Sequence, residues 1–171
     1  MGLKILVAED DRSMSGIYKI SLEAKGHHTT ITNDGDECAA VYREAVKKLD
    51  GKPSKYEPFD VVVLDYRMPK MDGLAAAKEI LKMNPDQRII FASAYVKETL
   101  RDSVRELEKV VELIQKPFEP KILVELIENT ATIKELEEIN KMVTDMDGSK
   151  SDDAQINELL AILKRVQKVG F

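Results

Sequence analysis

The chain has 171 residues, of which 26 are Lys or Arg and 31 are Asp or Glu, so its net charge is −5. This length fits one domain with an appendage, and the acidic balance argues against a protein whose main task is to bind nucleic-acid phosphates. No apolar run approaches the roughly 18 to 20 residues that span a bilayer, so we expect a cytoplasmic protein without membrane insertion. The single cysteine, Cys38, excludes an internal disulfide and suits a core position.

Short apolar runs alternate with longer amphipathic segments from the N-terminus to about residue 130. This alternation is typical of a parallel sheet with crossover helices, so we expect an α/β fold with a doubly wound, five-stranded parallel sheet. The predicted strands are 4–8, 28–32, 60–64, 88–92 and 110–114. The predicted helices between them are 12–25, 36–49, 74–83 and 97–108.

Beyond Pro120 the sequence gives only helix signals. We predict one helix from 121 to about 146, a break at 147–150 and a second helix from 151 to about 169, which together form a C-terminal helical hairpin. Each helix has one apolar seam with steps of three and four residues: Leu136, Ile139, Val143 and Met146 in the first, and Ile156, Leu159, Leu163 and Val166 in the second. The seams either pack on each other or on the main domain, or they form a self-association surface. We therefore expect a main domain over 1–130 and a helical extension over 131–171 for dimerisation or partner docking.

Polar side chains follow four of the predicted strands: Glu9 and Asp10, Asp65, Ser93, and Lys116. In a doubly wound sheet the carboxyl ends of the strands form the site, so these side chains are expected to gather in one pocket. Carboxylates brought together repel each other, and Mg²⁺ relieves that repulsion. A carboxylate could then attack a phosphoryl group, with the lysine and the hydroxyl stabilising its oxygens. Asp11 directly precedes the first helix and is expected to cap it rather than to bind a metal.

The segment VVVLDYRMPKMDG around Asp65, the acidic pair in ILVAEDD, the Ser93-Ala94 step and Lys116-Pro117-Phe118 occur in an order that resembles the receiver domains of two-component response regulators. The resemblance covers about residues 3 to 130 and implies a flavodoxin-like receiver fold. It implies Asp65 as phosphoacceptor, and Mg²⁺ ligands from Glu9, Asp10, Asp65 and the backbone carbonyl of Arg67. It also implies that Lys116 contacts the phosphoryl oxygens, that Ser93 moves to hydrogen-bond them, and that the Lys116-Pro117 bond is cis.

Two departures from the family pattern affect the mechanism. Leu113 stands where the family usually has an aromatic residue that swings inward on activation, and Tyr95 is a candidate to supply that bulk instead. The positions that flank the path of the hydrolytic water, Arg67 and Tyr95, are both large. We expect slow self-dephosphorylation, because bulky side chains there hinder in-line attack by water.

The resemblance implies a response regulator of a phosphorelay that signals through phosphorylation-controlled protein–protein interaction. Its expected partners are a histidine kinase or phosphotransfer protein and a downstream effector protein, and a second copy bound through the C-terminal helices is a further candidate. Its only expected catalysis is Mg²⁺-dependent self-phosphorylation and self-dephosphorylation. The alternative is a DNA-binding transcriptional regulator that uses Lys164, Arg165 and Lys168, although residues 121–171 hold 7 basic and 10 acidic side chains. A metal-dependent phosphatase is a third hypothesis.

Overall fold

Five short strands form one parallel sheet in the computed structural model of the chain, which describes residues 2–50, 52, 56–144 and 152–171. The strands are β1 (Lys4–Ala8), β2 (His28–Thr32), β3 (Val61–Asp65), β4 (Ile89–Ser93) and β5 (Glu112–Gln115). Their order is β2-β1-β3-β4-β5. This order confirms the predicted doubly wound α/β fold.

The three central strands are mostly apolar, as expected where helices cover both faces of a sheet. All five residues of β3 and of β4 are buried, as are four of the five in β1. The register pairs Ile5 of β1 with Thr29 of β2 on one side and with Val61 of β3 on the other. Both strand edges of β1 are therefore occupied.

The first compact unit of the chain ends at Ile90 and holds α1 (Arg12–Glu23), α2 (Gly35–Lys48) and α3 (Gly73–Met83). The Asp11 carboxylate accepts hydrogen bonds from the backbone N–H groups of Ser13 and Met14, so its predicted role as a helix cap is confirmed. Asp34 caps α2 in the same way, and Asp72 caps α3. Cys38 of α2 is fully buried, as its sequence context predicts.

The second compact unit runs from Phe91 to Phe171 and begins with α4 (Val96–Asp102). The prediction of one α-helix over 97–108 is wrong in its second half. The chain continues from α4 into a π-helical turn, η1 (Ser103–Leu107), which ends at Glu108 in the left-handed conformation. Residues 108–111 connect this turn to the sheet, so β5 begins at Glu112 rather than at the predicted residue 110.

Three further helices complete this unit: α5 (Pro120–Glu128), α6 (Ala131–Thr144) and α7 (Asp153–Gln167). The predicted continuous helix from 121 to about 146 is wrong, because α5 ends at Asn129, whose ψ of 82° is not helical. Asn and Thr side chains compete with helical backbone bonding, and Asn129-Thr130 is where the chain turns. The predicted break at 147–150, and Met146 with it, lie outside the described residues.

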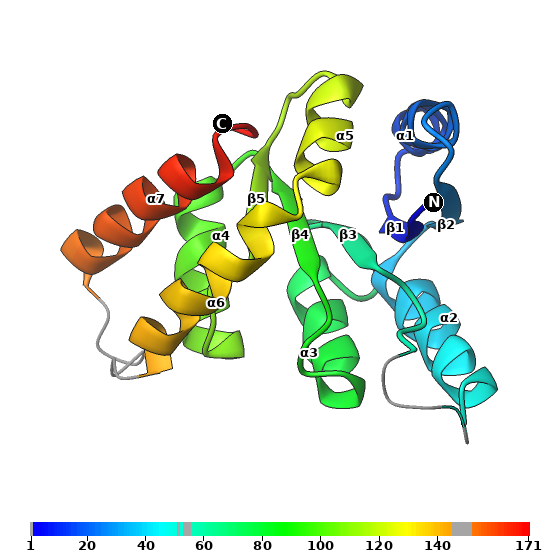
Figure 1. Ribbon diagram of the computed structural model, residues 1–171, viewed down its shortest axis with the longest axis horizontal. Coiled ribbons are helices and arrows are strands. Elements are labelled where there is room, and N and C mark those ends of the chain that lie inside the picture. The colour runs from blue at the N-terminus through cyan, green and yellow to red at the C-terminus, as the bar shows by residue number, and fades with distance from the viewer. Residues whose placement is uncertain (1, 51, 53–55, 145–151) are drawn as a thin grey trace. The chain divides into compact units, whose positions relative to one another are not determined.

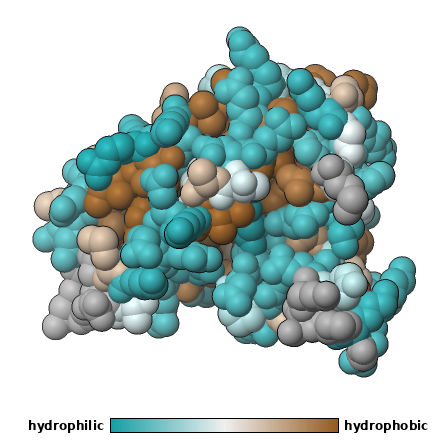
Figure 2. Space-filling model, in the orientation of Figure 1, coloured by the Kyte–Doolittle hydropathy of each residue, from teal (hydrophilic) through white to brown (hydrophobic). Residues whose placement is uncertain are grey.

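The extension packs within its own unit, where α7 lies against both α4 and α6 (Figure 1). The seams predicted from sequence are buried there at Ile139, Val143, Ile156, Leu159, Leu163 and Val166. In Figure 2 apolar side chains show between the polar outer surfaces of α6 and α7. Among the described residues, none of the helices combines the length and apolar character needed to cross a bilayer.

Candidate functional site

Three carboxylates gather in the first unit at the carboxyl ends of β1 and β3. Oxygen atoms of Glu9, Asp10 and Asp65 all lie within 4.8 Å of one another. Glu9 and Asp65 are buried, at 2% and 7% exposure, whereas Asp10 faces solvent. A buried pair of carboxylates with one solvent-facing partner is a set of hard oxygen ligands that suits a divalent cation such as Mg²⁺. The structure thus brings these three side chains together, as the sequence predicts.

Backbone contacts hold Glu9 in place. The N–H of Glu9 donates to the carbonyl of Thr32 on β2, at 3.1 Å. The Glu9 carboxylate accepts from the N–H of Asp11 at 3.1 Å, while the Asp11 carboxylate is turned to the start of α1. The acids on either side of Asp10 therefore have different tasks, and Asp11 is a cap rather than a member of the acidic cluster.

Tyr18 of α1 lies close enough to this cluster to sense its charge, and it was not singled out from the sequence. It is 1% exposed, and its burial, followed by the negative charges of Glu9, Asp65 and Asp11, raises its pKa above the ordinary value. No sequence motif marks it, since an apolar-face tyrosine in a helix is normally a core residue. The Tyr18 phenol is therefore neutral at physiological pH.

Gly73, the first residue of α3, packs directly against the backbone of Asp65 at the end of β3. A Cβ atom on Gly73 would lie 2.4 Å from the Asp65 carbonyl oxygen, closer than any ordinary contact. The N–H of Gly73 donates to the Tyr66 carbonyl at 3.0 Å and closes the loop that follows β3. Glycine at this position lets the start of α3 approach the backbone of Asp65 directly.

The start of α2 holds the same loop from the other side. The Gly35 N–H donates to the Met71 carbonyl at 3.1 Å, and Lys70 pairs with Asp34 at 3.4 Å. Lys70 has a positive φ of 65°, which fits a sharp turn. Arg67 lies in this loop two residues after Asp65, and its side chain is exposed.

The second unit carries the other predicted site residues, Ser93 and Lys116. The backbone N–H of Lys116 donates to the Ser93 carbonyl at 2.9 Å, so the ends of β4 and β5 place the two residues side by side. Ser93 is buried at 3% exposure. The peptide bond between Lys116 and Pro117 is cis, which confirms the prediction.

The Ser93 hydroxyl has two partners in its own unit. Its oxygen accepts from the N–H of Tyr95 at 3.0 Å and lies 2.8 Å from the hydroxyl oxygen of Thr99 in α4. Thr99 is fully buried and also bonds the Tyr95 carbonyl. Thr99 was not predicted from the sequence as a site residue. The sequence feature that marks it is a polar side chain among the apolar residues on the buried face of α4.

The two positions expected to modulate the site differ in exposure. Tyr95 is 56% exposed at the start of α4, whereas Leu113 is fully buried in β5. The Leu113 backbone N–H and carbonyl are both bonded to the side-chain amide of Gln167, a residue that was likewise not predicted. A signal for Gln167 was present, because it lies four residues after Leu163 and therefore on the apolar stripe of α7.

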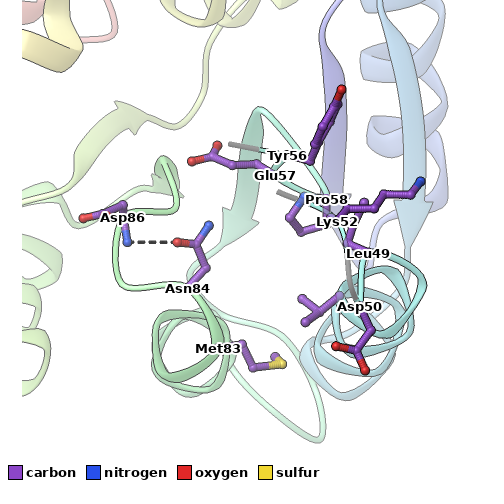
Figure 3. Close-up of a pocket in the computed structure, with 10 residues that line it drawn as sticks. Leu49, Asp50, Lys52, Tyr56, Glu57, Pro58, Met83, Asn84 and Asp86 are labelled. Atoms are coloured by element: carbon purple, nitrogen blue, oxygen red, sulfur yellow. Dashed lines mark hydrogen bonds between the residues drawn. The ribbon is translucent and has the colours of Figure 1, made fainter. Parts of the chain in front are cut away.

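A separate hollow of about 360 Å³ lies at the opposite end of β3 (Figure 3). Its lining includes Glu57 and Pro58, just before β3, and Asn84 and Asp86, just before β4. Burial, followed by the nearby charges of Asp60 and Asp86, raises the pKa of Glu57. None of its lining residues belongs to the predicted site, which follows the carboxyl ends of the strands.

The family model described as "Response regulator receiver domain" matches residues 5–128. The chain belongs to this family. It is 30% identical over 125 residues to the response regulator receiver protein CpdR of Brucella abortus, covering 73% of this chain and 93% of that protein. It is 30% identical over 129 residues to the chemotaxis protein CheY of Thermotoga maritima, covering 74% and 96%.

Solved structures agree on the fold. A response regulator receiver domain protein from Clostridium thermocellum superposes with a TM-score of 0.62 at 24% identity, covering 79% of this chain and 98% of that one. Receiver domains are signalling proteins rather than classical enzymes.

Proposed function

We propose that this receiver domain accepts a phosphoryl group on Asp65 in a Mg²⁺-dependent reaction and passes the signal on by protein–protein interaction. The observation that carries the proposal is the convergence of the Glu9, Asp10 and Asp65 oxygens within 4.8 Å in a member of the receiver family. Three carboxylates at this spacing repel one another, and a bound cation would offset that repulsion. The donor set is all oxygen, as Mg²⁺ prefers.

In this proposal Glu9, Asp10, Asp65 and the backbone carbonyl of Arg67 would hold the ion, which would supply positive charge to offset that of the carboxylates and the phosphoryl group. An Asp65 carboxylate oxygen attacks the phosphorus of a phosphohistidine on a kinase or phosphotransfer protein. The phosphorus–nitrogen bond breaks, and the departing imidazole takes up a proton. The Lys116 ammonium and the Ser93 hydroxyl then stabilise the phosphoryl oxygens.

Output by way of another protein is better supported than DNA binding. The extension is acidic overall, and one member of the proposed basic face, Lys164, stands over the Phe171 ring at 5.4 Å. A protein that neutralises nucleic-acid phosphates needs clustered, available cations. A downstream effector protein is therefore the proposed target, and the cytoplasmic location expected from the sequence stays a prediction.

Intact mass spectrometry tests the proposal directly. The protein is incubated with Mg²⁺ and an acyl phosphate donor, and native protein is compared with Asp65→Asn and with Asp72→Asn. Asp72 is an exposed aspartate of the same loop whose capping role an asparagine can fill, so it is the matched control. We expect one added phosphoryl group in the native protein and the control, and none in Asp65→Asn or with a chelator present. Uptake by Asp65→Asn would contradict the proposed phosphoacceptor.

A further inference from the structure

β5 stands at the end of the sheet, where its outer backbone groups would be open to another chain. The strand order places β5 last, with β4 on its inner side only. An open edge strand is a template for pairing with any extended segment. In this protein the outer edge of β5 is bonded by residues of the C-terminal extension.

Gln167 takes the place of a neighbouring strand. Its side-chain oxygen accepts from the Leu113 N–H at 2.9 Å, and its side-chain nitrogen donates to the Leu113 carbonyl at 2.7 Å. The second hydrogen of that nitrogen is directed to the Val169 carbonyl at 3.2 Å. Both amide donors are thus used, and the side chain is fully buried. A paired amide of this kind reproduces the hydrogen bonds of a sheet.

Two further contacts lie on either side of Leu113, one at Val110 just before β5 and one at Gln115 within it. Asn140 of α6 accepts from the Val110 N–H at 2.7 Å and donates to the Val110 carbonyl at 3.0 Å. The Gly170 carbonyl accepts from the Gln115 N–H at 2.7 Å. Gly170 has a φ of +103°, and a Cβ there would lie 3.1 Å from the Leu113 oxygen, so the contact requires glycine. We call Asn140, Gln167 and Gly170 together the edge cover.

The edge cover is attached to α4 at the far end of α7. Asp153, the first residue of α7, pairs with Arg101 of α4 and lies 3.8 Å from the Lys97 ammonium. Apolar residues of α7, including Leu159 and Leu163, are buried between these polar contacts. The position of α7, and with it that of Gln167, is therefore tied to the position of α4.

α4 is in turn bonded to the predicted signalling residue. Thr99 in its first turn lies 2.8 Å from the Ser93 hydroxyl oxygen and also bonds the Tyr95 carbonyl. If the Ser93 hydroxyl moves toward a phosphoryl group, its oxygen leaves the Thr99 hydroxyl that donates to it, and the start of α4 loses one of its anchors. The contacts therefore run without interruption from Ser93 through α4 and α7 to the edge of β5.

We propose that the C-terminal helices are an intramolecular, autoinhibitory cover for the β5 edge, and that phosphorylation and the closed cover oppose each other. The opposition between phosphorylation and the closed cover rests on the proposed function, whereas the cover itself does not. Because coupling between two equilibria is reciprocal, a state that opens the cover must also favour the phosphorylated form by the same factor. The closed cover keeps the edge unavailable to other chains until the signal arrives.

The existence of the cover is tested by hydrogen exchange of the full-length protein without phosphodonor. Gln167→Met keeps the side-chain length but makes neither bond to Leu113. Gly170→Ala keeps the Gln167 amide but places a Cβ 3.1 Å from the Leu113 oxygen and 3.3 Å from the Gln167 side-chain nitrogen. Asn157→Met, which removes an amide from the exposed face of the same helix, is the matched control. We expect the Leu113 and Gln115 amides to exchange about tenfold faster in both cover variants, because each variant weakens the hydrogen bonds that protect them. Native-like protection of β1 shows that the variants are folded.

The coupling is tested with Mg²⁺ and beryllofluoride, a mimic of the phosphoryl group, by titration calorimetry. We expect Gln167→Met to bind the mimic more tightly than the native protein by the factor seen in exchange, and the mimic to speed exchange at β5 in native protein but not in Asp65→Asn. Unchanged β5 exchange in both cover variants would overturn the cover itself. Equal mimic affinity in the two proteins would overturn the coupling. No binding of the mimic by native protein would refute the proposed function and the coupling, leaving the cover to stand on its own exchange result.

Discussion

The hydroxyl oxygens of Ser93 and Thr99 lie 2.8 Å apart, and both side chains are buried. Ser93 ends β4, and Thr99 lies in the first turn of α4, so this contact joins a site residue of the sheet to the helix that carries α7. The Ser93 oxygen accepts from the Thr99 hydroxyl in this position, and it would leave that contact if Ser93 moved toward a ligand. Loss of this one hydrogen bond would therefore change how Ser93 is held.

Replacing Thr99 by valine should shift Ser93 toward the ligand-bound state. Valine keeps the shape of threonine but offers no hydrogen bond, so the Ser93 hydroxyl retains only its contact with the Tyr95 N–H. We expect Thr99→Val to bind Mg²⁺-beryllofluoride several-fold more tightly, since the lost bond is worth on the order of 1 kcal/mol. Thr99→Ser keeps the hydroxyl and serves as the control. Titration calorimetry measures both, and equal affinities for Thr99→Val and native protein would speak against this role.

The lifetime of the phosphorylated protein should depend on two exposed side chains. Arg67 and Tyr95 are both large, and the family resemblance places them beside the path of the hydrolytic water. Substitution of both by small or amide side chains, Arg67→Asn with Tyr95→Ala, should shorten the lifetime because water then reaches the phosphorus in line more often. The decay of the phosphorylated mass after donor removal measures this. Glu98→Ala, a truncation of an exposed side chain close to Tyr95 in the chain, is the control, and an unchanged decay in the double variant would exclude the idea.

Regular apolar runs made the fold predictable. The predicted bounds of β1 match the structure and those of β3 and β4 differ by one residue, because continuous apolar residues mark strands that are buried on both faces. The bounds of β2 also match, although its signal is the alternation of an edge strand. The acidic cluster was predictable for a related reason, since the ends of parallel strands meet at one edge of the sheet. Local pattern and topology were sufficient for both.

Long-range polar contacts could not be predicted in this way. The π-helical turn η1 and the end of α5 at Asn129 depend on local backbone geometry that periodicity does not encode. Gln167 and Asn140 stand on apolar stripes, but nothing in the sequence says that their partners are the backbone groups of Leu113 and Val110, 54 and 30 residues away. An amide on an apolar stripe is the signal to follow in such cases.

The contribution of Asp34 to stability should depend on pH. Hydrogen bonding from the Glu37 N–H, helped by the charge of Lys70, holds the pKa of Asp34 below its ordinary value of 3.8. A carboxyl with a lowered pKa stabilises the fold above its unfolded pKa and loses that effect as pH falls through the folded pKa. We therefore expect Asp34→Asn to lower the urea midpoint at pH 6, and the difference from native protein to vanish as pH falls well below about 3.8.

The comparison for this experiment is Asp36→Asn, which removes the same charge from an exposed position in the first turn of the same helix. Asparagine remains a good helix cap, so Asp34→Asn isolates the charge from the capping geometry. Urea unfolding followed by circular dichroism at several pH values provides the midpoints. A difference between Asp34→Asn and native protein that stays constant across the whole acidic range would assign the effect to packing instead.

Alanine at Gly73 and alanine at Gly16 should change the free energy of unfolding in opposite directions. In Gly73→Ala the new Cβ would lie 2.4 Å from the Asp65 carbonyl, so the loop after β3 must move, at a cost of about 1 to 3 kcal/mol in the free energy of unfolding. Gly16 lies within α1, where a Cβ would meet no atom within 4 Å beyond its own helix, and Gly16→Ala should stabilise the fold by about 0.5 to 1 kcal/mol. Because the displaced backbone carries Asp65, Gly73→Ala should also take up the phosphoryl group more slowly, whereas Gly16→Ala should match native protein. Urea unfolding and intact mass measure the two effects, and a stable Gly73→Ala with native uptake would show that the close approach to Asp65 is dispensable.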